Sequence, residues 1–158
     1  CSPDRIHAYR SRLSGPLLDR IDLQIALRQV TIADLTKGAQ GEPSAHVRER
    51  VVTARAVQLD RRDRREVRAD VNAALGPADV AKVAALDAAG SELLSRAVER
   101  LGLSARAYDK VLRVARTIAD LDGSTPVKSA HVAEAIQMRL LDRRSAPPAP
   151  KRGDPAAA

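Results

Sequence analysis

A single strand-like segment in an otherwise helical sequence is the feature that most constrains the fold. From Ile21 to Leu27, apolar side chains occupy every second position and alternate with polar or small ones. This period is typical of a β-strand with one buried face. A lone strand leaves backbone N–H and C=O groups without partners, so it needs a sheet that the sequence does not visibly supply. We therefore expect the chain to be part of a larger protein, as its first residue, Cys1 rather than methionine, also indicates.

Helical periodicity dominates the rest of the chain. In the last helical stretch, for example, Val132, Ala135, Ile136 and Leu140 recur at the spacing of one helix face. The predicted fold is mostly α, with a helix and one strand followed by a helical bundle. The expected organisation is residues 1–30 for the helix and strand, 31–44 for a linker, 45–144 for the bundle and 145–158 for a tail. The tail is rich in proline and alanine, and we expect it to be disordered because it lacks apolar residues to bury.

Capping and breaking residues predict where individual helices begin and end. Gly15 and Pro16 are expected to end the first helix, and Pro77 to open a short one. Ser91 is a candidate N-cap for a helix that Gly102 closes. Ser104 is placed to cap the longest helix, because a serine hydroxyl can accept a hydrogen bond from a backbone amide of the first turn.

Composition excludes several classes of protein. The two aromatic residues, Tyr9 and Tyr108, cannot form a large base-stacking surface. No apolar run is long enough for a transmembrane helix, and no signal peptide is present, so we expect no membrane partner. One cysteine allows no intrachain disulfide, which fits a reducing cytoplasm. No phosphate-binding loop, dinucleotide motif or HExxH motif occurs, so the isolated chain is expected not to hydrolyse ATP or another substrate.

The chain is basic, and its arginines gather in two groups. The formal net charge is +7, from 27 lysines and arginines against 20 acidic residues. The first group is Arg48, Arg50, Arg55, Arg61, Arg62, Arg64, Arg65 and Arg68, and the second is Arg139, Arg143, Arg144, Lys151 and Arg152. A solvated charged face is the ordinary interpretation of such groups. The excess positive charge also favours contact with DNA phosphates.

Three segments resemble the ring-forming AAA+ ATPases of the magnesium chelatase type, in particular their ComM/YifB branch. These segments are RLSGPLLDRIDL at residues 12–23, LSARAYDKVLRVARTIADL at 103–121 and HVAEAIQMR at 131–139. The resemblance covers nearly all of residues 1–144. It implies the C-terminal part of such an ATPase, comprising the end of the α/β core and the α-helical lid.

The resemblance also implies functional residues. Arg20, just before the strand, matches an arginine finger that would act in trans on the ATP of a neighbouring subunit. Arg106 matches the second sensor, which would touch the ATP γ-phosphate in cis, with Ser104 at the same helix N-terminus. Guanidinium groups suit this chemistry because they stay charged and donate in a fork. The ordinary alternatives are a salt bridge between Arg20 and Asp19 or Asp22, and a solvated Arg106. ATP and Mg²⁺ are the implied cofactors, bound mainly by residues outside this chain.

Three functions remain open at this point. The resemblance favours an ATP-driven ring of identical subunits that acts on DNA, as in branch migration. One alternative is the motor subunit of a magnesium chelatase that acts on porphyrin. The other is a basic helical module that binds nucleic acid without being an enzyme. The resemblance further implies that Cys1 is the last ligand of a metal-binding insert, although one cysteine cannot complete a tetrahedral site.

Overall fold

The structure is a computed structural model that describes residues 5, 8–9, 12–27, 29–32, 36 and 41–139. Predictions for Cys1, for most of the helix before Gly15 and for the tail from residue 145 lie outside these residues, as do residues 140–144.

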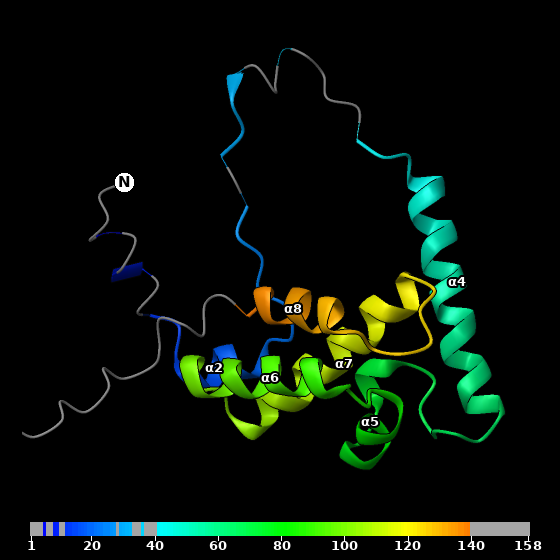
Figure 1. Cartoon of the computed structure of the whole chain (residues 1–158). Helices are drawn as coiled ribbons and strands as arrows, with labels where there is room; N and C mark the ends of the chain where they lie inside the picture. Colours follow the sequence, from blue (N-terminus) through cyan, green and yellow to red (C-terminus); the bar gives the residue numbers. More distant parts are fainter. Residues whose placement is uncertain are drawn as a thin grey trace, which may run out of the picture.

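The described part of the chain is mostly helical (Figure 1). Its helices are α2 (Gly15–Arg20), α4 (Ser44–Asp63), the 3₁₀ turn η1 (Asn72–Ala74), α5 (Pro77–Val83), α6 (Ala88–Leu101), α7 (Ala105–Leu121) and α8 (Ser129–Gln137). None of the described helices is long and apolar enough to cross a lipid bilayer.

Helix α7 is the centre of the bundle. It packs against α8, α4, α5, η1 and α2, and α6 packs against α8. Val111, Ala115 and Ala119 recur along its inner face and are fully buried, which is the pattern expected for an amphipathic helix with a narrow apolar stripe. The core continues through Val80 of α5 and Leu94 of α6.

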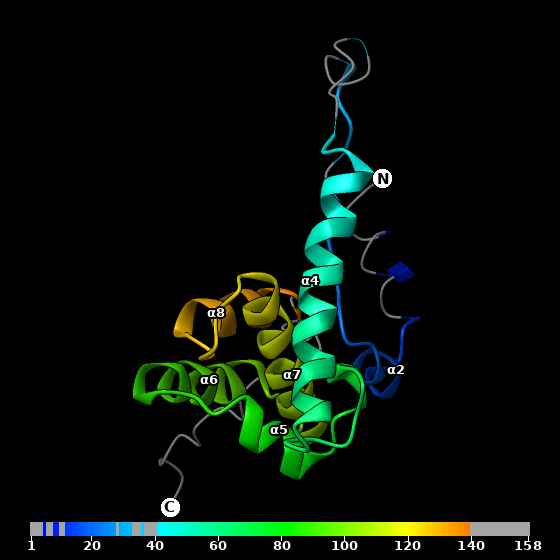
Figure 2. The ribbon, with the colours of Figure 1, turned by 90° about the vertical axis from the view of Figure 1, so that its right-hand side faces the viewer.

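Helix α4 projects from the bundle (Figure 2). Only Ala54 and Gln58, both in its C-terminal half, are buried, and that half contacts α7. Every residue from 44 to 53 is exposed. The first half of α4 therefore has no tertiary packing in the described residues.

The predicted strand is an extended segment rather than a member of a sheet. Within the described part of the chain, it pairs through an isolated parallel bridge between Gln24 and Arg139, with the Gln24 N–H donating to the Met138 carbonyl over 2.7 Å. Gln24 is buried against the bundle, whereas Ile25 and Leu27 are 70% and 91% exposed.

Two helix boundaries differ from the sequence prediction, and others are confirmed. Gly15 and Pro16 begin α2, a helix that the sequence analysis did not predict, and the Ser14 hydroxyl caps it by accepting from the Leu17 amide. Asp87, and not Ser91, caps α6, where its carboxylate accepts from the Gly90 amide over 2.7 Å.

The predicted closure of α6 and capping of α7 are both confirmed. Gly102 ends α6 in the left-handed region at φ 62°, a conformation that glycine adopts without steric cost. Ser104 caps α7, accepting from the Ala107 amide over 3.0 Å.

Candidate functional site

The arginines expected from the sequence lie beside one surface pocket. This pocket of about 440 Å³ lies where the C-terminal end of α2 meets the first turns of α7. It is lined by Arg20, Ala105, Arg106, Asp109, Lys110 and Arg113. The fold thus brings together Arg20 and Arg106, which are far apart in the sequence.

Arg106 is the most available cation of the pocket. It lies in the first turn of α7, where unpaired backbone N–H groups and the helix dipole favour an anion. Among the described residues, no hydrogen bond or ion pair reaches its guanidinium. Arg20 is also exposed, and its Nη1 donates to the Pro16 carbonyl over 3.0 Å. An anion in the pocket could therefore be approached by two exposed guanidinium groups.

The other charged residues of the pocket are already engaged or acidic. Arg113 donates through Nε to the Leu75 carbonyl over 3.0 Å. Lys110 forms an ion pair of 2.7 Å with Asp22. Among the described residues, Asp109 is the one carboxylate that lines the pocket. The pocket therefore carries an excess of positive charge and suits a polyphosphate.

The chain leaves α2 at Asp19 to Asp22, the last two residues of the helix and the first two of the extended segment, here called the Asp19–Asp22 turn. Side chains of the bundle hold this turn. The Ser104 hydroxyl donates to Asp19 Oδ1 over 2.6 Å. Its single proton is thus directed to Asp19 and not into the pocket. Lys110 Nζ donates to the Arg20 carbonyl. Ser104 and Lys110 together hold the Asp19–Asp22 turn against the N-terminal part of α7.

Arg139 holds the same turn from the end of α8. Its Nη1 donates to the Ile21 carbonyl over 2.7 Å, and its Nη2 lies 4.0 Å from Asp19 Oδ1. The side chain is 1% exposed. The sequence places Arg139 in the second basic group, but the structure buries it, so it is not part of a charged surface.

Lys110 and Arg139 are the residues that sequence reasoning missed. Lys110 lies three residues after Ala107 and four before Val114, within the stripe that α7 turns toward the bundle. A lysine at such a position was the available signal, because a long cation on an inner helix face needs a polar partner.

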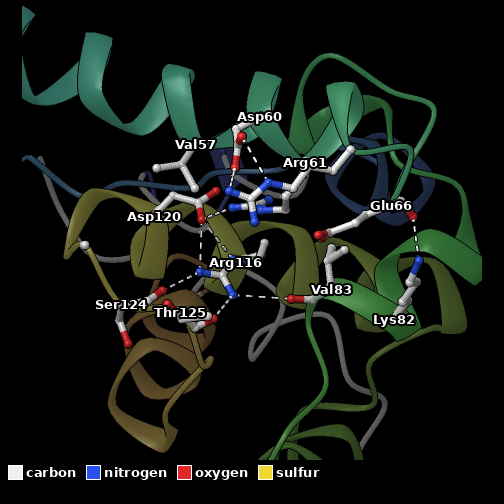
Figure 3. Close-up of a pocket in the computed structure, with 12 residues that line it drawn as sticks. Val57, Asp60, Arg61, Glu66, Lys82, Val83, Arg116, Asp120, Ser124 and Thr125 are labelled. Carbon is white, nitrogen blue, oxygen red and sulfur yellow. Dashed lines mark hydrogen bonds and ion pairs between the residues drawn. The ribbon is translucent and has the colours of Figure 1, made fainter.

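A second pocket, of about 480 Å³, surrounds a buried charge network between α4, α7 and the loop after α7 (Figure 3). Asp120 accepts hydrogen bonds from Arg61, Arg116 and Asn72. Arg116 also donates to the carbonyls of Val83, Ser124 and Thr125.

The donors of Arg116 are therefore taken up by the protein itself. Burial lowers the pKa of its guanidinium, Asp120 opposes this shift, and Arg61 adds to it. Arg116 and Asp120 are four residues apart in α7, the spacing at which side chains lie on one face of a helix. The network is structural, and Arg116 has no donor left for a ligand.

Half of the first basic group is neutralised within the chain. Four of its members pair with carboxylates, in the ion pairs Arg50–Glu42, Arg61–Asp120, Arg62–Asp63 and Arg64–Asp60. Arg55 donates to Gln58 and to the Asp70 carbonyl. The cationic surface offered to a polyanion is therefore smaller than the sequence indicates.

The described residues offer no metal site. No group of three or more histidine, cysteine or acidic residues is close enough to hold an ion in the part of the chain that the structure describes. The pocket residues therefore fit the phosphates of ATP but do not fit Mg²⁺ on their own. Cys1, the predicted metal ligand, lies outside the described residues.

Comparison with known proteins finds two family models that match consecutive parts of the chain. The model described as "Magnesium chelatase, subunit ChlI C-terminal" matches residues 41–139, and "Magnesium chelatase, subunit ChlI" matches residues 1–35.

Curated proteins from several bacteria are similar over 90% of the chain. Competence protein ComM of Haemophilus influenzae is 39% identical over 143 residues, which make up 90% of this chain and 27% of that protein. An uncharacterized protein, YifB, of Escherichia coli is 37% identical over 144 residues, 90% of this chain and 27% of that protein. The chain thus spans about a quarter of the length of the curated relatives it matches.

Proposed function

Because the chain belongs to the magnesium chelatase ChlI C-terminal family, we propose that it is the C-terminal part of an AAA+ ATPase that works as a ring of identical subunits. One observation carries this proposal. Arg20 and Arg106 line one open pocket with an excess of positive charge, and Arg106 has no partner among the described residues.

Arg106 acts in cis in this proposal. A phosphate at the first turn of α7 would meet the helix N-terminus, which already favours an anion, and a full positive charge beside it. Ser104 caps the same turn and so fixes the direction in which its amides point. Loss of the γ-phosphate would then be transmitted to the helical bundle through α7.

Arg20 acts in trans. Its guanidinium is exposed at the edge of the pocket, so it is accessible to a nucleotide bound by an adjacent subunit. A guanidinium at that position would stabilise the charge that develops on the transferred phosphoryl group. The Mg²⁺ and the remaining phosphate contacts would be supplied by residues outside this chain.

The action of the ring is proposed to be on DNA. The support is the similarity to a protein named for competence and the net charge of +7. The family description supports a second candidate function, that of the motor subunit of a magnesium chelatase, which would drive insertion of magnesium into porphyrin. Stimulation of the ATPase by DNA would favour the first function, and stimulation by a porphyrin-binding partner the second.

The test uses the longer ATPase that carries this chain. Arg20→Ala and Arg106→Ala should each lower kcat by about 10³-fold or more, the size reported for loss of such a guanidinium, while the ring still assembles. Arg96→Ala, which removes an exposed arginine paired with Glu92 on α6, is the matched control and should retain activity. If turnover survives both pocket substitutions, the assigned roles are wrong.

Rings assembled from two kinds of variant subunit distinguish action of Arg20 in trans from action in cis. Subunits with Arg20→Ala are mixed with subunits that lack a functional phosphate-binding loop. If Arg20 acts in trans, some interfaces combine an intact loop with an intact Arg20, and part of the activity returns. If Arg20 acts on the ATP of its own subunit, no interface is complete and the mixture stays inactive.

A further inference from the structure

We propose that Lys110 is a positioning residue, which fixes Arg20 relative to Arg106 by holding the Asp19–Asp22 turn on α7. The inference rests on the proposed function, in that Arg20 and Arg106 both contact phosphate groups and both line this pocket. It concerns a residue to which the resemblance assigned no role.

The contacts of Lys110 are directed at the backbone next to Arg20 and not at the Arg20 side chain. Its Nζ donates to the Arg20 carbonyl and forms an ion pair of 2.7 Å with Asp22. Because the carbonyl belongs to the residue whose guanidinium reaches the pocket, moving Nζ moves the base of the Arg20 side chain. Arg106 lies one helical turn before Lys110 on the same helix.

Burial makes this contact a strong constraint. The Lys110 side chain is 8% exposed, whereas that of Asp22 is 58% exposed. A buried ammonium group without partners is costly, so α7 and the turn are each stabilised by the presence of the other. The lysine therefore couples the end of α2 to α7, across 90 residues of sequence.

A direct contact between Lys110 and phosphate is the competing explanation, because Lys110 also lines the pocket. The two explanations differ in one respect. If Lys110 acts through Arg20, replacing Lys110 should have little effect on phosphate binding in a chain that already lacks the Arg20 guanidinium. If it binds phosphate directly, the effects of the two substitutions should be additive.

The first measurement needs no ligand. Hydrogen exchange is followed at the Ile21 and Gln24 amides, which donate to the Leu18 and Met138 carbonyls. Lys110→Met should accelerate exchange at both amides by about tenfold, while amides of α6 are unchanged. Lys82→Met is the matched control, because Lys82 also donates to a backbone carbonyl, that of Glu66. Unchanged exchange in Lys110→Met overturns the proposal.

The second measurement is a double-mutant cycle on binding of inorganic pyrophosphate to the 158-residue chain. Lys110→Met should weaken binding by about five- to tenfold in the wild-type background and by less than twofold in the Arg20→Ala background. Lys110→Arg should restore binding, because a guanidinium can still donate to the Arg20 carbonyl. Additive losses overturn the proposal in favour of direct contact.

A third variant tests positioning without the risk that the chain fails to fold. Asp22→Ala changes a half-exposed side chain and leaves the apolar core intact. On charge alone, removal of this carboxylate would strengthen pyrophosphate binding, whereas loosening of the turn would weaken it. Weaker binding supports positioning, and stronger binding contradicts it.

Failure of the proposed function gives a different result from failure of the inference about Lys110. If wild-type and Arg106→Ala chains bind pyrophosphate equally, the phosphate site is wrong. The exchange rates at Ile21 and Gln24 still decide whether Lys110 holds the turn.

Discussion

At the scale of single residues, the chain depends on charged side chains that are buried and fully paired. Asp120 is the clearest case, with a side chain that has no exposed surface and that accepts from two arginines and one asparagine. Such groups contribute little net stability when paired but are costly when one partner is lost. The residue scale is therefore where single substitutions have their largest expected effects.

Asp120→Ala should lower the free energy of unfolding by about 3–5 kcal/mol, because it leaves two guanidinium groups buried beside each other. Asp63→Ala, which removes a carboxylate that is 65% exposed, should cost about 0–1 kcal/mol. Urea unfolding followed by circular dichroism measures both. Equal losses in the two variants would show that the network is not a structural constraint.

Ser104→Ala should lower the free energy of unfolding by about 1–2 kcal/mol. The substitution removes the cap on the Ala107 amide and the hydrogen bond to Asp19. Ser95→Ala, at an exposed position inside α6, is the control and should not destabilise, since alanine is the better helix former. Thermal unfolding of the two variants tests the comparison; a stable Ser104→Ala would contradict the capping role.

At the scale of elements, α4 and α7 differ most in how much of each helix is packed against the rest of the chain. Helix α7 is surrounded by other helices, whereas α4 is packed only in its second half. Val51 and Val52, in the first half of α4, are 48% and 61% exposed. A helix whose apolar residues face solvent gains little from tertiary contacts, and isolated helical turns are marginal in water.

Residues 44–53 of α4 should therefore exchange their backbone amide hydrogens at least about tenfold faster than residues 54–63. The reason is that opening of the first half breaks no packing contact, whereas the second half carries Ala54 and Gln58 against the bundle. Residue-resolved hydrogen exchange by NMR measures this difference. Uniform protection along α4 would mean that its first half is packed in solution.

At the scale of the whole molecule, positive charge is less available than the total of +7 indicates. Arg50, Arg61, Arg62 and Arg64 are held in ion pairs, and Arg139 is buried. Counterion release depends on the number of phosphates that free cations can neutralise. The surface of this chain should therefore make few phosphate contacts.

The isolated chain should bind duplex DNA only weakly, with a Kd of about 10⁻⁴–10⁻⁶ M at physiological salt and a shallow dependence on salt. Fluorescence anisotropy at several salt concentrations measures both quantities. Nanomolar binding with a steep salt slope would instead favour a helical module that binds nucleic acid by itself.

The sequence by itself determined the local features of this protein. Proline, glycine and serine signals correctly predicted the start of α5 at Pro77, the end of α6 at Gly102 and the Ser104 cap of α7. These features depend on residues at most a few positions apart, so the chain encodes them locally.

Only the tertiary structure decided which charged residues are buried and which apolar residues are exposed. Ser104, Lys110 and Arg139 reach the Asp19–Asp22 turn across 85, 90 and 118 residues of sequence. The alternating segment that follows presents Gln24 to the bundle and leaves Ile25 and Leu27 in solvent. Periodicity shows that a segment has two faces, but burial is set by the surface it meets, and that surface forms only when distant parts of the chain come together.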